Sequence, residues 1–128
     1  MKLWLDDIRN PPDDSWLVAR TADAAIAHMK TAIAIGDPIY EVSLDHDLGH
    51  CEACTGCNGY QSSCGCRCHL SGTFVVNWMA TEGVWPVKVR VHSMNPVGAK
   101  NMQATLLRYG PYAEVPWVSI KYTEGQKP

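Results

Sequence analysis

At 128 residues, the chain is long enough for a single domain that hides about two-thirds of its unfolded surface in one core. A formal net charge of −2 leaves no broad basic face for a nucleic-acid backbone, so polymeric DNA or RNA is not expected as a partner. Residues 1–7 lack the apolar run of a signal peptide, and no segment has the length of a membrane-spanning helix. We therefore expect a cytoplasmic protein that does not contact membranes.

Short apolar strands alternate with helical stretches in the first half of the chain. A strand over residues 2–5 runs directly into the acidic pair Asp6-Asp7, and a second short strand is expected over residues 16–19. Thr21 can cap a helix that stops at Gly36 and has an apolar stripe formed by Ala22, Ala25, Ile26, Met29 and Ile33. A third strand over residues 40–44 is again followed at once by titratable side chains, those of Asp45, His46 and Asp47.

The same alternation continues after residue 70. A helix over residues 72–81 would bury Val75, Val76 and Met79, and a fourth strand over residues 87–91 ends on His92 and Ser93. Asn95 is a good helix cap in front of Pro96, a residue type favoured in the first turn. The helix that follows is expected to run through Met102, Leu106 and Leu107 and to stop near Gly110. A last strand is expected over residues 115–122, ahead of a disordered tail at 123–128.

Residues 50–69 interrupt the alternation and contain all six cysteines of the chain. They form two clusters with metal-ligand spacing, and the candidate ligands are Cys51, Cys54, Cys57, Cys64, Cys66, Cys68 and His69. In a reducing compartment this spacing favours a tetrahedral structural zinc site over disulfides or free thiols. One ion with spare thiols and two ions both agree with the pattern. We interpret the chain as one domain over residues 1–128 with a zinc-binding insertion at 50–69.

Strands that alternate with helices favour an α/β fold with a mostly parallel sheet and helices on both of its faces. Ligands of such sheets bind in the crevice beyond the carboxyl ends of the strands. Three strand ends carry polar side chains here, so the acidic pair, residues 45–47 and the pair His92-Ser93 are expected to meet in space.

Two kinds of chemistry are expected at these strand ends. The carboxylates of Asp6, Asp7 and Asp45 would share a proton, raise a pKa or bind a hard cation such as Mg²⁺, unless they cap helices or face water. His46 and His92 suit an acid and base pair near neutral pH, although a histidine at a strand end is also a common hydrogen-bonded structural residue.

The helix that begins after Asn95 adds a third feature, because a helix N-terminus offers free N–H groups and a positive dipole end to a phosphate. Gly98 would let an anion approach the backbone closely. Further candidates for contact with a phosphorylated substrate, each also compatible with solvated surface, are Arg9, Asp47, Ser93, Asn95 and Lys100.

Three runs at these positions resemble the motifs of the cyclic-phosphate-processing receiver domains. The runs are LDDIRNP at residues 5–11, SLDHDLG at 43–49 and HSMNPVG at 92–98, and they occur in this order. The resemblance implies a receiver-like, flavodoxin-like fold in which Asp6, Asp7 and Asp45 match the acidic pocket of response-regulator receivers. It also implies that His46 and His92 are additions suited to phosphoester chemistry.

The same resemblance implies hydrolysis of a cyclic phosphate on a nucleotide or an ADP-ribose derivative. The connection between Asp7 and Trp16 is too short for the usual first receiver helix, and Lys121 is not placed as the receiver lysine, so phosphorelay signalling is not expected. Two other interpretations use the same residues. One is a non-catalytic module that binds or sequesters a nucleotide, and the other is a zinc-stabilised interaction domain with a vestigial pocket.

Overall fold

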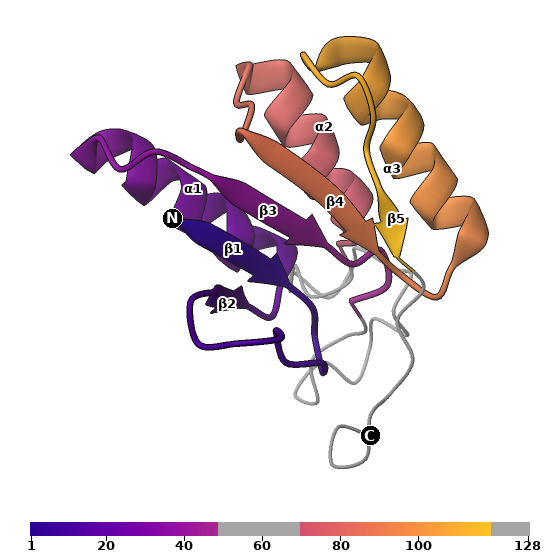
Figure 1. Ribbon diagram of the computed structural model, residues 1–128, viewed down its shortest axis with the longest axis horizontal. Helices are drawn as coiled ribbons and strands as arrows, with labels where there is room; N and C mark the ends of the chain where they lie inside the picture. Colours follow the sequence, from indigo (N-terminus) through magenta and orange to yellow (C-terminus); the bar gives the residue numbers. More distant parts are fainter. Residues whose placement is uncertain (49–69, 119–128) are drawn as a thin grey trace, which may run out of the picture.

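The described part of the chain forms a parallel β-sheet with helices packed against it. The computed structural model describes residues 1–48 and 70–118. The strands are β1 (Lys2–Leu5), β2 (Leu17–Ala19), β3 (Glu41–Leu44), β4 (Lys88–His92) and β5 (Trp117–Val118). They pair in the order β2-β1-β3-β4-β5 and every pair is parallel (Figure 1). The predicted zinc ligands, the predicted disordered tail and the end of the predicted last strand lie outside the described residues.

Each of the three helices in this part of the chain begins at a polar cap that the sequence contains. In α1 (Ala22–Ile35) the Thr21 side chain accepts a hydrogen bond from the backbone N–H of Ala24, and Gly36 ends the helix with a φ of 74°. Ser71 caps α2 (Gly72–Glu82), and Asn95 caps α3 (Pro96–Tyr109). These helices confirm the predicted α/β alternation, with ends that differ from the expected ones by a residue or so.

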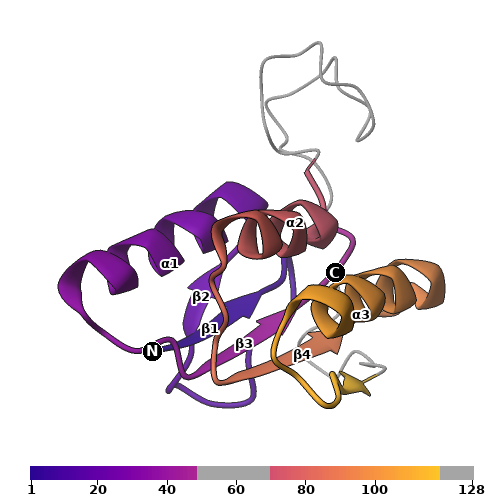
Figure 2. The ribbon, with the colours of Figure 1, turned by 90° about the horizontal axis from the view of Figure 1, so that it is seen from above.

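All three helices lie together on one face of the sheet, as Figure 2 shows. Parallel strands are joined by right-handed crossovers. The face of the sheet on which a connecting helix lies therefore depends on the direction in which the connection moves across the sheet. The three helical connections, β2 to β3, β3 to β4 and β4 to β5, all move in the same direction. The connection that moves the other way, β1 to β2, contains no helix. The expectation of helices on both faces is therefore wrong for the described residues.

The hydrophobic core fills the space between the sheet and these helices. Alternate strand residues point into it, and each is at most 4% exposed: Leu3, Leu5, Val42, Leu44, Val89 and Val91. The buried stripe of α1 continues through Ala32, whereas the predicted Ile33 is 54% exposed. In α3, Leu106 is buried and Leu107 is exposed. Ile33 and Leu107 each lie one position beyond the stripe of their helix that faces the sheet.

The opposite face of the sheet is polar and aromatic, and the β1–β2 connection helps to cover it. Trp4 stacks on the imidazole of His92 with ring centroids 3.9 Å apart, and Trp16 meets Trp4 edge-on at 5.7 Å. The Lys2 ammonium lies 4.4 Å from the centre of the Trp16 ring, and the Arg90 guanidinium lies 5.2 Å from it. The polar residues Ser43 and His92 on this face are at most 1% exposed.

Among the described helices, none is long and apolar enough to cross a membrane.

Candidate functional site

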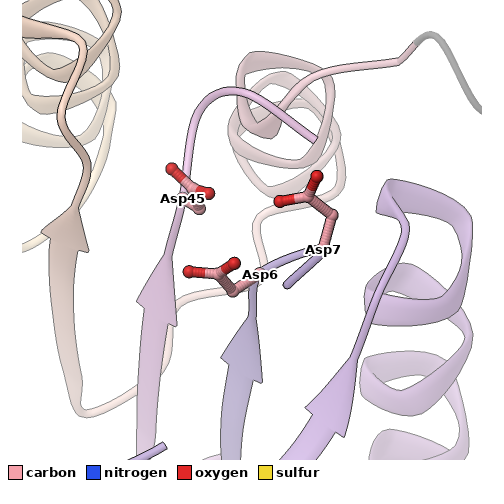
Figure 3. Close-up of side chains that lie close together, drawn as sticks. All are labelled: Asp6, Asp7 and Asp45. Atoms are coloured by element: carbon pink, nitrogen blue, oxygen red, sulfur yellow. The ribbon is translucent and has the colours of Figure 1, made fainter. Parts of the chain in front are cut away.

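Three aspartates converge at the carboxyl ends of β1 and β3. Asp6 and Asp7 follow β1 and Asp45 follows β3, and Figure 3 shows their carboxyl groups facing a common space. One oxygen from each of these acids lies within 4.8 Å of the other two. The sequence prediction that these acids meet is therefore confirmed by the geometry.

Asp6 is the most fully hydrogen-bonded of the three. Its Oδ1 accepts the backbone N–H groups of Ile8 at 2.9 Å and Arg9 at 2.8 Å. Its Oδ2 lies 3.1 Å from Arg9 Nη1 and 3.1 Å from His92 Nε2. Burial alone would raise the pKa of Asp6, but the hydrogen bonds from His92 and the two backbone N–H groups outweigh burial and hold the pKa below its ordinary value. Asp6 is therefore an ionised carboxylate that its hydrogen bonds hold in place.

The pKa values of Asp45 and Asp7 are shifted in the opposite direction. Burial, followed by the nearby negative charge of Asp6, raises the pKa of Asp45 to about 7. The same two causes raise the pKa of Asp7. Asp45 is 3% exposed and its Oδ1 accepts the backbone N–H of His46 at 2.8 Å. This group of three acids, which we call the acidic pocket, thus combines one ionised carboxylate, Asp6, with two carboxyl groups that hold a proton more tightly than usual.

Arg9 enters the pocket from the β1–β2 connection. Its Nη1 lies 3.1 Å from Asp6 Oδ2 and 3.5 Å from Asp45 Oδ2, and the residue is 6% exposed. The predicted substrate contact by Arg9 is therefore replaced, in this structure, by contacts with the two most buried acids. Its positive charge partly neutralises the pocket.

His92 is buried beside Asp6 and is 1% exposed. Its Nδ1 lies 2.6 Å from Ser43 Oγ, and its Nε2 lies 3.1 Å from Asp6 Oδ2. The Ser43 hydroxyl also accepts a hydrogen bond from Arg90 Nε at 3.2 Å, which leaves its O–H free to donate to the imidazole. Burial lowers the pKa of His92 below its ordinary value, although Asp6 opposes this change. These contacts favour a neutral ring that donates from Nε2 to Asp6.

His46 lies closer to the surface and has a different environment. Its side chain is 21% exposed, and its Nδ1 lies 2.8 Å from Asp47 Oδ1. The Asn95 amide nitrogen is 3.3 Å from each oxygen of Asp47. A carboxylate that accepts a hydrogen bond from Nδ1–H leaves Nε2 as the basic nitrogen of the imidazole. The pair His46 and Asp47 therefore has the arrangement of a general base.

Gly98 has a role that the sequence analysis did not predict. A Cβ atom at this position would overlap the imidazole ring of His46. The missing side chain therefore makes room for His46, and the space expected for an anion beside Gly98 is taken by this ring.

The N-terminus of α3 is also more fully occupied than predicted. Asn95 Oδ1 accepts the N–H of Gly98 at 2.9 Å, and the Asn95 carbonyl accepts the N–H of Ala99 at 2.9 Å. Pro96 has no N–H, and Ser93 Oγ is an acceptor for the N–H of Asn95 at 3.1 Å. Asn95 and Ser93 thus build the turn, and few N–H groups are left for the predicted phosphate contact.

Sequence reasoning missed the residues that hold His92. Ser43, Trp4 and Arg90 are register partners on three neighbouring strands, so their side chains lie in one row across the sheet. The signal in the sequence was the alternation in β3, where Ser43 lies between the core residues Val42 and Leu44.

A five-stranded parallel sheet with acids after β1 and β3 defines a receiver-like α/β domain. The family model of the cyclic-phosphate processing receiver domain matches residues 1–108, and the chain belongs to this family. No curated protein and no solved structure matches the chain in the same comparisons. The family assignment confirms the resemblance found in the sequence and associates the chain with cyclic phosphates.

Proposed function

We propose that the protein is a phosphoesterase that opens a cyclic phosphate by hydrolysis, with a nucleotide or an ADP-ribose derivative as substrate. The observation that carries this proposal is the pair His46 and Asp47, in which a partly exposed imidazole directly after Asp45 is held by a carboxylate through Nδ1. Family membership supports the class of substrate. Membership alone does not distinguish hydrolysis from binding.

The proposed reaction uses His46 as the base and Asp45 as the acid. His46 Nε2 removes a proton from water, and the hydroxide oxygen forms a bond to phosphorus. The bond from phosphorus to one ring oxygen breaks, and that oxygen takes the proton of Asp45, whose pKa of about 7 keeps the carboxyl group partly protonated at neutral pH. The product is a ring-opened phosphomonoester. Transfer of a proton from His46 to Asp45 through solvent restores the starting state.

His92 takes a different part from the one expected from the sequence. The buried ring, with both nitrogens engaged, suits a positioning residue that holds Asp6, and not the second half of an acid and base pair. The charge of Asp6 in turn contributes to the raised pKa of Asp45. His92 would thus act on the reaction through two carboxyl groups.

Product formation from a panel of cyclic phosphates tests the proposal. The panel contains nucleoside 2′,3′-cyclic phosphates, 3′,5′-cyclic nucleotides and an ADP-ribose cyclic phosphate, and phosphorus NMR detects ring opening. We expect His46→Ala to lower kcat by roughly 10²-fold or more, the usual contribution of a general base. His28→Ala, in the middle of α1, is the matched control and should retain the wild-type rate. Equal rates of both variants would contradict the assignment of His46.

One observation favours a second candidate, a non-catalytic module that binds the same ligand. Asp6 is 0% exposed, His92 is 1% exposed and Asp45 is 3% exposed, so three of the five expected catalytic residues have little access to a ligand in this conformation. Tight binding with recovery of unaltered ligand from the whole panel would support the binding module. Any ring-opened product that depends on His46 would rule it out.

A further inference from the structure

We propose that the guanidinium group of Arg9 takes the place of a divalent cation in the acidic pocket, so that the pocket works without Mg²⁺. The oxygens of Asp6, Asp7 and Asp45 are close enough together for one ion. The contacts of Asp6 and the positive charge of Arg9, however, oppose an additional cation. This inference concerns the pocket itself and does not depend on hydrolysis of a cyclic phosphate.

Asp6 has no lone-pair position to give to a metal ion. A carboxylate offers about four acceptor positions, two on each oxygen. Asp6 Oδ1 accepts two backbone N–H groups, and Oδ2 contacts one nitrogen of Arg9 and one of His92. A Mg²⁺ ion needs a direct bond of about 2.0–2.1 Å in near-octahedral geometry. It would have to displace one of these partners, and each of them is itself held in place.

Arg9 already links the two most buried acids of the set. Its Nη1 lies 3.1 Å from Asp6 and 3.5 Å from Asp45, so one positive charge serves both carboxyl groups. A divalent cation between the same groups would be repelled by this charge at short range in a buried site. Two carboxylates and several waters are enough to bind Mg²⁺, so the charge of Arg9, and not a lack of oxygens on Asp7 and Asp45, opposes an ion there.

The position of Arg9 is fixed by its backbone. The Arg9 N–H donates to Asp6, and the Arg9 carbonyl accepts from Trp4 Nε1 at 3.0 Å and from Arg20 Nη1 at 2.8 Å. These three contacts connect the loop to β1, to the aromatic face of the sheet and to the end of β2. Arg9 is therefore a buried residue whose backbone is held by hydrogen bonds, and not a surface side chain that moves aside at little cost.

Calorimetric titration of the full chain with Mg²⁺, without any substrate, tests the proposal. We expect no saturable binding by the wild type up to millimolar Mg²⁺. Arg9→Gln removes the charge and should create a saturable site at least about tenfold tighter than any binding by the wild type, a gain of the size expected for a modest coupling energy. Arg9→Lys keeps the positive charge and should resemble the wild type. Mg²⁺ prefers oxygen ligands, so the cysteine-rich segment does not compete.

Matched variants locate the effect. Arg108→Gln removes the same charge from an exposed position near the end of α3 and should behave like the wild type. Adding Asp45→Asn to Arg9→Gln should remove the new site. Saturable binding by the wild type that Asp45→Asn abolishes would overturn the proposal, even if Arg9→Gln does not fold. Failure of a folded Arg9→Gln protein to bind Mg²⁺ would overturn it as well, because Arg9 would then not be the group that excludes the ion.

Discussion

Asp45 is a carboxyl group that the fold keeps almost entirely out of water, beside a second negative charge. Burial and the charge of Asp6 raise its pKa from 3.8 to about 7, although the Arg9 guanidinium opposes the change. The native state therefore holds this proton at a pH where the unfolded chain has released it. Because the native state binds more protons between these two pKa values, the free energy of unfolding falls as the pH rises from about 4 to about 7.

The amide in Asp45→Asn removes this titration and keeps an oxygen for the N–H of His46. We expect the variant to be more stable than the wild type at pH 8 by up to about 4 kcal/mol, with little difference at pH 4. Urea denaturation at a series of pH values measures the effect. Asp14→Asn, at an exposed position, is the control. If Asp45→Asn and the wild type keep the same difference in stability at every pH, Asp45 is not the group that titrates.

At the scale of elements, the start of α3 links the helix to the pocket. Gly98 lies in the first turn of the helix, and a Cβ atom there would overlap the His46 imidazole. Alanine is favoured over glycine within helices by about 1 kcal/mol, which offsets part of the cost of this overlap. The substitution should therefore displace His46 more than it disturbs the fold.

Gly98→Ala is expected to shift the imidazole NMR signals of His46 and to lower ring-opening activity by about tenfold or more, with a small change in Tm. The expected loss follows from moving a base out of hydrogen-bonding reach of the attacking water. Arg108→Ala, at an exposed position near the other end of the same helix, should leave both the signals and the rate unchanged. Unchanged His46 signals in a folded Gly98→Ala protein would show that the glycine does not make room for this ring.

The elements themselves were largely predictable because their signals are local. The caps Thr21 and Asn95, the break at Gly36 and the acids directly after β1 and β3 lie next to the structures that they determine. The partners of His92 were not predictable in the same way. Ser43 is 49 residues away from His92 in sequence and Asp6 is 86 residues away, so their contacts depend on strand order and register. The role of Gly98 was mistaken because a glycine can admit either a ligand or a neighbouring side chain.

At the scale of the whole molecule, the three described helices leave one face of the sheet to the β1–β2 connection. The direction rule for crossovers explains this arrangement, since the connection that moves the other way across the sheet has no helix. The same connection contains Arg9, so the segment that accepts a hydrogen bond from Trp4, the residue stacked on His92, also brings the guanidinium group to the acids. The β1–β2 connection without a helix and the arginine beside the acids therefore belong to the same segment of the chain.

The cysteine-rich segment between β3 and α2 gives a last prediction for the whole molecule. We propose that it holds structural zinc through four of its cysteine and histidine side chains, so the purified chain should contain at least one zinc ion.

The hydrophobic core joins residues on both sides of this segment, such as Leu44 and Val75, and is built by direct packing of strands and helices. Removal of zinc with a chelator should therefore unfold the segment but keep the sheet, seen as a preserved near-ultraviolet signal from Trp4 and Trp16, which pack edge-on. The double substitution Cys51→Ser with Cys54→Ser should lower the zinc content measured by mass spectrometry, and Ser62→Ala should not. A wild-type chain without zinc would contradict the metal assignment, and loss of the tryptophan signal on chelation would show that the sheet depends on the ion.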